Sequence, residues 1–217
     1  MNRKTVFLDR DGVINENRDK DYVKGWDEFR FLPKTKDAIK ALTDANWDII
    51  VVSNQAGIGR GVMSAQSVEE INARMVEEIE KDGGRIKAVY YCPHTPDANC
   101  DCRKPKPGML LRAAREFGVD LLNSYLIGDS LSDIQAAAKV GCKTILVKTG
   151  RGIDSLERRE QWIVDPDYVV PNLLEAASLV LAIDRICLQR KYTSDSRRPV
   201  LSRSVALSFQ SVPESPR

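Results

Sequence analysis

Histidine is almost absent from this sequence, which has one copy, His94, among 217 residues. Catalytic triads of the Ser-His or Cys-His type use a histidine as the general base. His94 lies among three cysteines in CPHTPDANCDC, residues 92–102, where we expect it to bind a metal. The scarcity of histidine therefore argues against a serine- or cysteine-based triad.

The sequence also lacks a strong charge bias and a long apolar run. Its formal net charge is +2, so no global basic bias indicates nucleic acid as a partner. The N-terminal stretch MNRKTVFLDRDG reaches Asp9 before any long apolar run, so we expect no signal peptide, no transmembrane span and no membrane partner. Length and a hydrophobic content of 42% predict one globular domain over residues 1–190.

Cysteine occurs five times, an odd number, and three copies are clustered. This pattern predicts metal binding in a reducing compartment, and hence a cytoplasmic protein, rather than a disulfide framework. Cys92, His94, Cys100 and Cys102 supply three thiolates and one imidazole, a set that suits Zn²⁺ and completes a tetrahedron. A catalytic zinc keeps a position open for water, so we expect a structural zinc; the alternative is a reduced cluster without metal. The other two cysteines, at 142 and 187, are expected to be buried.

Apolar strand-like runs alternate with helix-like segments along the chain. We expect strands at residues 5–9, 48–54, 86–92, 124–130, 143–150 and 167–170. We expect helices at residues 34–46, 67–81, 107–117, 133–140 and 172–189. The order predicts an α/β fold with a doubly wound, mostly parallel sheet and helices on both faces.

Local signals mark where some of these elements begin and end. Ser67 and Glu70 are predicted to form a capping box at the start of one helix, and Gly118 to end another.

From residue 191 the composition turns to Ser, Arg and Pro, so residues 191–217 are predicted to be a disordered or weakly docked tail.

Acidic and polar side chains follow three of the predicted strands. Asp9, Asp11, Ser53, Asn54 and Asp129 lie at strand ends, where an open parallel sheet binds its ligands. In D-R-D-G the two carboxylates point the same way, and they repel each other unless a cation or a proton intervenes. Hard carboxylate oxygens at three strand ends predict a Mg²⁺ site. A lone D-x-D would more simply cap a turn or a helix.

Two further segments offer groups for binding phosphate. Gln55 and Ala56 follow the second strand in a glycine-rich loop that contains Arg60, and such a loop suits phosphate oxygens. Arg103 and Lys104 come directly after the cysteine cluster and supply cationic donors. The simpler interpretations are an ordinary glycine-rich loop and a solvated basic pair.

Four motifs, FLDRDG, VVSNQ, RKPKPGM and LIGDSLSD, occur in this order over roughly residues 4–150. Together they resemble the haloacid dehalogenase superfamily of phosphatases. The resemblance implies that Asp9 is the nucleophile and Asp11 the acid and base, with Ser53, Asn54 and Lys104 on the phosphate. It implies Mg²⁺ on Asp9, the Asp11 backbone carbonyl and Asp129, and no large cap domain.

The Cys-His cluster narrows the resemblance to the branch of heptose bisphosphate and histidinol-phosphate phosphatases. The SNQAGIGRG stretch resembles the heptose enzymes, and the short CPHTPDANCDCRKPK loop resembles the histidinol-phosphate enzymes. We favour removal of the C7 phosphate of D-glycero-D-manno-heptose 1,7-bisphosphate. The expected substrate-contacting residues are Asn17, Tyr22, Ser53, Asn54, Gln55, Ala56, Arg60, Arg103 and Lys104. We expect the segment from Asn17 to Tyr22 to be the loop that faces the substrate.

Two other classes of protein stay open at this point. A phospho-accepting receiver domain also has an aspartate at a strand end and a later lysine, although it needs no acid or base at the position of Asp11. A zinc-dependent nucleic-acid module would need a basic face and an aromatic platform that the sequence does not indicate. We expect a monomer whose partner is a phosphorylated small molecule.

Overall fold

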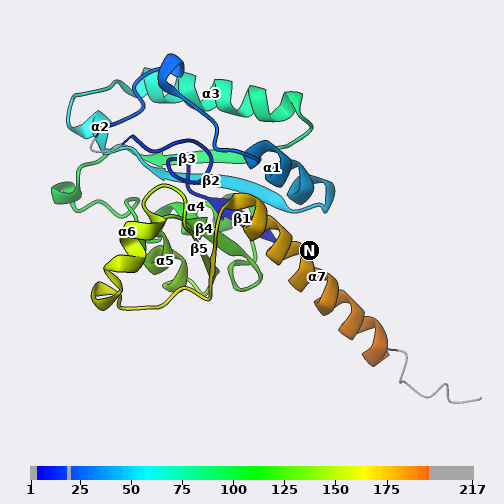
Figure 1. Ribbon diagram of the computed structural model, residues 1–217. Coiled ribbons are helices and arrows are strands. Elements are labelled where there is room, and N and C mark those ends of the chain that lie inside the picture. The colour runs from blue at the N-terminus through cyan, green and yellow to red at the C-terminus, as the bar shows by residue number, and fades with distance from the viewer. Residues whose placement is uncertain (1–3, 19–20, 196–217) are drawn as a thin grey trace, which may run out of the picture. The chain divides into compact units, whose positions relative to one another are not determined.

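The computed structural model describes residues 4–18 and 21–195 (Figure 1). Its centre is a six-stranded sheet in the order β3-β2-β1-β4-β5-β6, and all neighbouring strands are parallel. The strands are β1 (Thr5–Leu8), β2 (Asp48–Asn54), β3 (Ala88–Cys92), β4 (Tyr125–Gly128), β5 (Lys143–Val147) and β6 (Tyr168–Val170). The predicted α/β class with a parallel sheet is confirmed.

Helices connect the strands in sequence order. The α-helices are α1 (Thr35–Asp44), α2 (Ala56–Gly59), α3 (Ala65–Lys81), α4 (Gly108–Phe117), α5 (Leu131–Ala138), α6 (Gly152–Glu157) and α7 (Leu173–Asp195). The described part of the chain also has the single 3₁₀ turns η1 (Trp26–Glu28), η2 (Pro96–Ala98), η3 (Leu121–Asn123) and η4 (Arg159–Gln161). The short helices α2 and α6 were not predicted, because a run of four to six residues shows no helical period.

Successive side chains of a strand point to opposite faces of the sheet, so the buried core is divided into two clusters, one on each face. On β1, Val6 and Leu8 belong to one buried cluster, which also contains side chains of α1, α3 and the start of α7. Phe7 belongs to a second cluster, shared with α4 and α5. Figure 1 shows α1 and α3 on one side of the sheet and α4 and α5 on the other. The sheet is therefore apolar on both faces. The sequence predicts this, because its strands are continuous apolar runs and do not alternate apolar with polar residues.

The chain divides into two compact units, Met1–Ala182 and Ile183–Arg217. The first contains the whole sheet. In the second the chain is helical as far as Asp195, so helix extends past residue 191, where the tail was predicted to begin. Residues 196–217 of that predicted tail lie outside the described residues. No helix among the described residues is both long enough and apolar enough to cross a membrane.

The structure corrects two local predictions. Helix α3 begins at Ala65, and its N-cap is Ser64, whose side chain accepts a hydrogen bond from the Ser67 N–H. The capping box predicted for Ser67 is therefore wrong, because Ser67 already lies in the first turn. Cys142 is buried as predicted, but Cys187 is exposed, since no described residue of α7 beyond Ala182 joins either core cluster.

The cap of α3 can be tested by a pair of serine substitutions. Ser64→Ala is expected to lower the free energy of unfolding by about 1 kcal/mol, because the Ser67 N–H loses its acceptor at 3.0 Å. Ser67→Ala is the matched control and should change stability by less than about 0.5 kcal/mol. Urea unfolding followed by circular dichroism measures both, and equal losses would contradict this assignment of the cap.

Candidate active site

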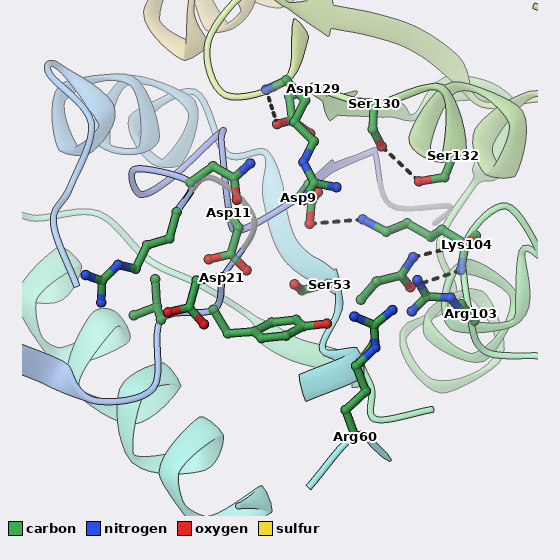
Figure 2. A pocket seen from close by; sticks show the side chains of 17 residues that line it. Asp9, Asp11, Asp21, Ser53, Arg60, Arg103, Lys104, Asp129, Ser130 and Ser132 are labelled. Carbon is green, nitrogen blue, oxygen red and sulfur yellow. Dashed lines mark hydrogen bonds and ion pairs between the residues drawn. The ribbon is translucent and has the colours of Figure 1, made fainter. Parts of the chain in front are cut away.

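A cavity of ≈ 310 Å³ lies where the carboxyl ends of the central strands meet (Figure 2). Register brings these ends together, because Leu8 of β1 lies between Val51 of β2 and Ile127 of β4. Asp9 follows directly, and its N–H donates to the Ile127 carbonyl at 3.0 Å. The carboxyl edge of the sheet is therefore the floor of this cavity, as expected for a parallel sheet.

Lys104 is buried at the base of the cavity and binds groups from three elements. Its Nζ donates to the Val52 carbonyl at 2.7 Å and lies 3.0 Å from Asp9 Oδ1 and 2.5 Å from Asp133 Oδ1. Burial disfavours the ammonium form, but the charges of Asp133 and Asp9 outweigh it and raise the pKa of Lys104. Lys104 is therefore cationic at neutral pH.

The carboxyl groups in the floor are crowded. Burial raises the pKa of Asp9 to about 7, with Asp133 and Asp11 adding to the rise and Lys104 opposing it. The pKa of Asp129 is also raised well above its ordinary value, first by burial and then by the charge of Asp9. Such a cluster favours either bound protons or a cation.

Asp9, Asp129 and Asp133 form a group that could hold a metal ion, since one carboxylate oxygen from each lies within 4.8 Å of the others. This donor set fits a hard cation such as Mg²⁺. Asp133 was missed in the sequence, although it is the last residue of the LIGDSLSD motif. A local signal existed, because Ser130 and Asp133 have capping-box spacing and form that box at the start of α5.

Asp129 is held by backbone groups. The Arg151 N–H donates to its Oδ2 at 2.8 Å. Gly12 and Gly150 both have positive φ, and a Cβ on either would come within 2.0 to 2.2 Å of Asp129 Oδ2. Both positions therefore need glycine, for conformation and for space. The role of Gly150 had no signal in the sequence, because Gly150 and Gly12 are far apart along the chain and meet only in the folded protein.

Asp11 is surrounded by hydrogen-bond donors. The Arg10 guanidinium lies 3.0 and 3.2 Å from its two oxygens, and the side chains of Asn15 and Gln55 donate at 2.9 and 2.8 Å. Burial opposes ionisation, but Arg10, Asn15 and Gln55 outweigh it and hold the pKa of Asp11 below its ordinary value. Arg10 is itself buried and also donates to Asn72 of α3 at 3.1 Å.

The residues after β2 have different surroundings. Ser53 and Asn54 line the cavity. The Gln55 side chain does not; it is buried and donates to both Asp11 and Ser53 Oγ, each at 2.8 Å. Gln55 was predicted as a substrate contact, whereas in the structure its amide orders two neighbouring side chains.

Most of the other predicted site residues also surround the cavity. Arg60 and Arg103 project toward one another beside Lys104 (Figure 2). The predicted residues in the lining are Asp9, Asp11, Asn17, Tyr22, Ser53, Asn54, Ala56, Arg60, Arg103, Lys104 and Asp129. Arg18 and Asp21 also line the cavity; both belong to the segment from Asn17 to Tyr22 that was predicted to face the substrate, and residues 19–20 of that segment lie outside the described residues. Lining residues that were not predicted are Val23, Ser130, Ser132 and Arg151.

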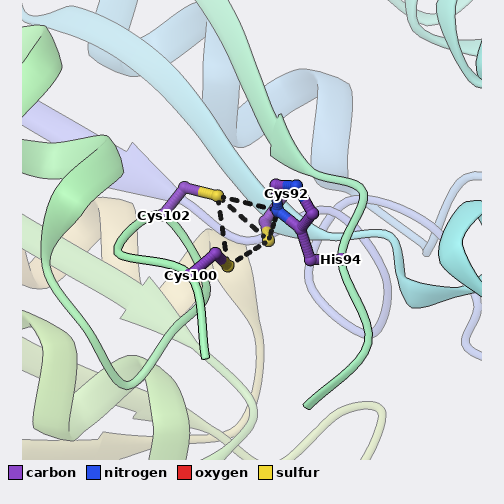
Figure 3. A group of neighbouring side chains, drawn as sticks. All are labelled: Cys92, His94, Cys100 and Cys102. Carbon is purple, nitrogen blue, oxygen red and sulfur yellow. Dashed lines mark hydrogen bonds between the residues drawn. The ribbon is translucent and has the colours of Figure 1, made fainter. Parts of the chain in front are cut away.

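The Cys-His cluster forms a second candidate metal centre, at the end of β3 and in the loop that follows (Figure 3). The three Sγ atoms of Cys92, Cys100 and Cys102 lie 3.2 to 3.5 Å apart, and His94 Nδ1 lies 3.4 Å from Cys102 Sγ. A tetrahedron of Zn–S bonds sets a separation of about 3.8 Å, so the four donors are close to the arrangement that zinc requires. The structure brings together the four residues that the sequence singled out.

A comparison with protein families finds that the HAD-hydrolase-like family model matches residues 101–176. Among curated relatives, D-glycero-beta-D-manno-heptose-1,7-bisphosphate 7-phosphatase of Pseudomonas aeruginosa is 46% identical over 156 residues, which are 72% of this chain and 87% of the relative. The enzyme of the same name from Neisseria meningitidis serogroup A is 39% identical over 178 residues, 82% of this chain and 95% of the relative.

Solved structures give the same result. A crystal structure of D,D-heptose 1,7-bisphosphate phosphatase from B. bronchiseptica, complexed with magnesium and phosphate, superposes with a TM-score of 0.78. It is 39% identical in sequence, and the match covers 82% of this chain and 98% of that chain. With relatives this similar over nearly their full lengths, the chain is a phosphatase and belongs to the heptose-1,7-bisphosphate 7-phosphatase family of haloacid dehalogenase-like hydrolases.

Proposed function

We propose that the protein hydrolyses the C7 phosphate of D-glycero-β-D-manno-heptose 1,7-bisphosphate, with Asp9 as the nucleophile. The observation that carries this proposal is the position of Asp9, at the end of the central strand and in ionic contact with Lys104 at the base of the cavity. The names of the curated relatives support the heptose substrate over histidinol phosphate. Membership of a phosphatase family sets aside the receiver domain and the nucleic-acid module.

The chemistry proceeds in two displacements at phosphorus. A carboxylate oxygen of Asp9 attacks the phosphorus, the bond to the C7 oxygen breaks, and an aspartyl-phosphate forms. Asp11 gives its proton to the departing oxygen. Water then attacks the same phosphorus, Asp11 takes a proton from it, and the bond from phosphorus to Asp9 breaks.

The surroundings of Asp11 favour the second half of this cycle, because Arg10, Asn15 and Gln55 stabilise its carboxylate form. The doubly charged phosphate of a bound substrate brings negative charge close to Asp11 and so raises its pKa. Substrate binding therefore favours protonation of Asp11 from solvent, and this is the proton that Asp11 gives to the departing oxygen in the first displacement.

Asp9, Asp129 and the Asp11 backbone carbonyl would hold Mg²⁺, with Asp133 within reach of the same position. When bound, Mg²⁺ neutralises the clustered carboxylates and the phosphate. Ser53 offers a hydroxyl and Lys104 an ammonium group to the phosphate oxygens, whose charge grows in the transition state.

The loop that contains the Cys-His cluster adjoins the two basic residues of the site. Cys102 directly precedes Arg103, and the Arg103 guanidinium donates to the His94 carbonyl at 3.2 Å. A closed Zn²⁺ site with four protein ligands would fix the loop and with it the position of Arg103 and Lys104. Arg60 and Arg103 together offer two bidentate donors to a second phosphate of the substrate.

The role of Asp9 is tested by Asp9→Asn. Turnover of the heptose bisphosphate should fall by at least about 10³-fold, because an amide cannot form the covalent intermediate. Asp44→Asn on the exposed end of α1 is the control and should leave kcat unchanged.

The substrate class is tested with wild-type protein and Mg²⁺, by comparing kcat/KM for sugar bisphosphates, histidinol phosphate and p-nitrophenyl phosphate. A preference for histidinol phosphate would overturn the proposed substrate.

The zinc is tested by Cys100→Ser. Elemental analysis of the wild-type protein should find about one zinc per chain. The variant should bind less zinc, melt at a lower temperature and lose activity, because the loop is no longer fixed. Cys187→Ser, which changes an exposed cysteine outside the cluster, is the control. A folded and fully active protein without zinc would refute a structural role for the metal.

The contribution of the ion pair between Arg10 and Asp11 to stability is tested by Arg10→Met. The free energy of unfolding at pH 7 should fall by about 3 kcal/mol, because the Asp11 carboxylate loses its buried cationic partner. The pKa of Asp11 is lowered in the folded protein, so its contribution is present above the unfolded pKa and is lost as the pH falls. The effect of the substitution should therefore shrink below about pH 4.

Arg18→Met removes an ion pair with Glu28 that is partly exposed, and it is the matched control. Its effect on stability should be much smaller, because exposed pairs contribute little. Chemical denaturation from pH 3 to pH 8 measures both variants. An Arg10→Met effect that does not depend on pH would exclude the ion pair as its cause.

A further inference from the structure

The side chain of Asn54 binds the backbone of a residue fifty positions later in the chain. Its Nδ2 donates to the Lys104 carbonyl at 3.0 Å, and its Oδ1 accepts from the Lys104 N–H at 3.1 Å. One carboxamide therefore satisfies both backbone polar groups of a single residue, in the way that a neighbouring strand would.

Lys104 has no regular secondary structure that could hold it. It lies between the cysteine cluster and α4, in a stretch of bends and turns. Pro105 and Pro107, which follow it, have no N–H to donate. The nearby backbone bonds join Lys106 to Arg103 and Gly108 to Asp101, and neither involves Lys104. The two contacts with Asn54 are thus what ties the backbone of Lys104 to the sheet.

Strand β2 contacts both ends of this lysine. The backbone is held by Asn54, and the ammonium group donates to the carbonyl of Val52, two residues earlier on the same strand, at 2.7 Å. Lysine is a flexible side chain that carries a point charge. Contacts at both ends fix its length and direction, and so place Nζ between Asp9 and Asp133.

We infer that Asn54 is a positioning residue, which acts on catalysis by holding Lys104 rather than by binding the sugar. The inference rests on the role proposed for Lys104 at the phosphate. Because Asn54 also lines the cavity, contact with the substrate is the competing role. The two roles predict different kinetics.

The experiment compares wild-type protein and Asn54→Ala on two substrates with Mg²⁺ present. If Asn54 acts through Lys104, kcat should fall by about 10- to 100-fold on both the heptose bisphosphate and p-nitrophenyl phosphate, with KM for the sugar changed less than about threefold. If Asn54 contacts the sugar, KM for the bisphosphate should rise while p-nitrophenyl phosphate, which has no sugar, is turned over normally. That second outcome overturns the inference.

A double-mutant cycle gives an independent readout. Adding Asn54→Ala to Lys104→Met should cause no further loss of kcat, because the lysine on which Asn54 acts is already gone. Independent, multiplicative losses would contradict the inference. A direct contact of Asn54 with the phosphate would also lower kcat on both substrates, and multiplicative losses in this cycle would identify it. Should Lys104→Met fail to fold, Lys104→Gln takes its place in the cycle.

Two controls separate this inference from other failures. Asn123→Ala removes an exposed amide that is bonded to Asp120, and it should leave kcat and KM within about twofold of wild type. Asn54→Ala should keep about one zinc per chain, which excludes loss of the loop as the cause. A wild-type protein that hydrolyses neither substrate would contradict the proposed function. It would leave the contact between Asn54 and the backbone of Lys104 unaffected.

Discussion

Lys104 carries one positive charge into a place where three buried carboxylates meet, and the rest of the site depends on that contact. Its ammonium group joins Asp9 after β1, the Val52 carbonyl on β2 and Asp133 on α5. Removing one partner from such a group leaves unpaired buried charge, which is far more costly than losing an exposed ion pair. The contact thus links three parts of the fold that are distant in sequence, and it offsets part of the negative charge of the floor.

Two separate sets of contacts hold the segment that contains Lys104. The Cys-His cluster, with the zinc proposed for it, would fix the loop before it, and Asn54 binds its backbone to the carboxyl edge of the sheet. The first contact would depend on a metal and the second does not. A lysine on an irregular segment needs such support if it is to act on a substrate, because side chains on loops are placed less accurately than those on strands and helices.

Much of the site could be predicted from the sequence, because its signals are local. Asp9 and Asp129 follow apolar runs, and the four zinc donors lie within eleven residues. Contacts made by the folded chain could not be read in this way. The pairing of Asp133 with Lys104, and the use of Gln55 to order Asp11, need the sheet register that brings these segments together. The start of α3 was misplaced by a competing local signal, since Ser64 and Ser67 are both good N-caps.

The position of β1 in the middle of the sheet has a consequence for synthesis of the protein on the ribosome. The strand that precedes Asp9 is made early, yet its partner on one side is β4, and the Thr5 N–H donates to Ser124 Oγ across 119 residues of chain. At usual elongation rates that interval is roughly 6 to 24 seconds. Throughout it, β1 has an open edge, which is the feature that invites wrong pairing. A nascent chain must therefore protect its most important strand for most of its synthesis, and a chain that stops before β4 cannot form the phosphatase site at all.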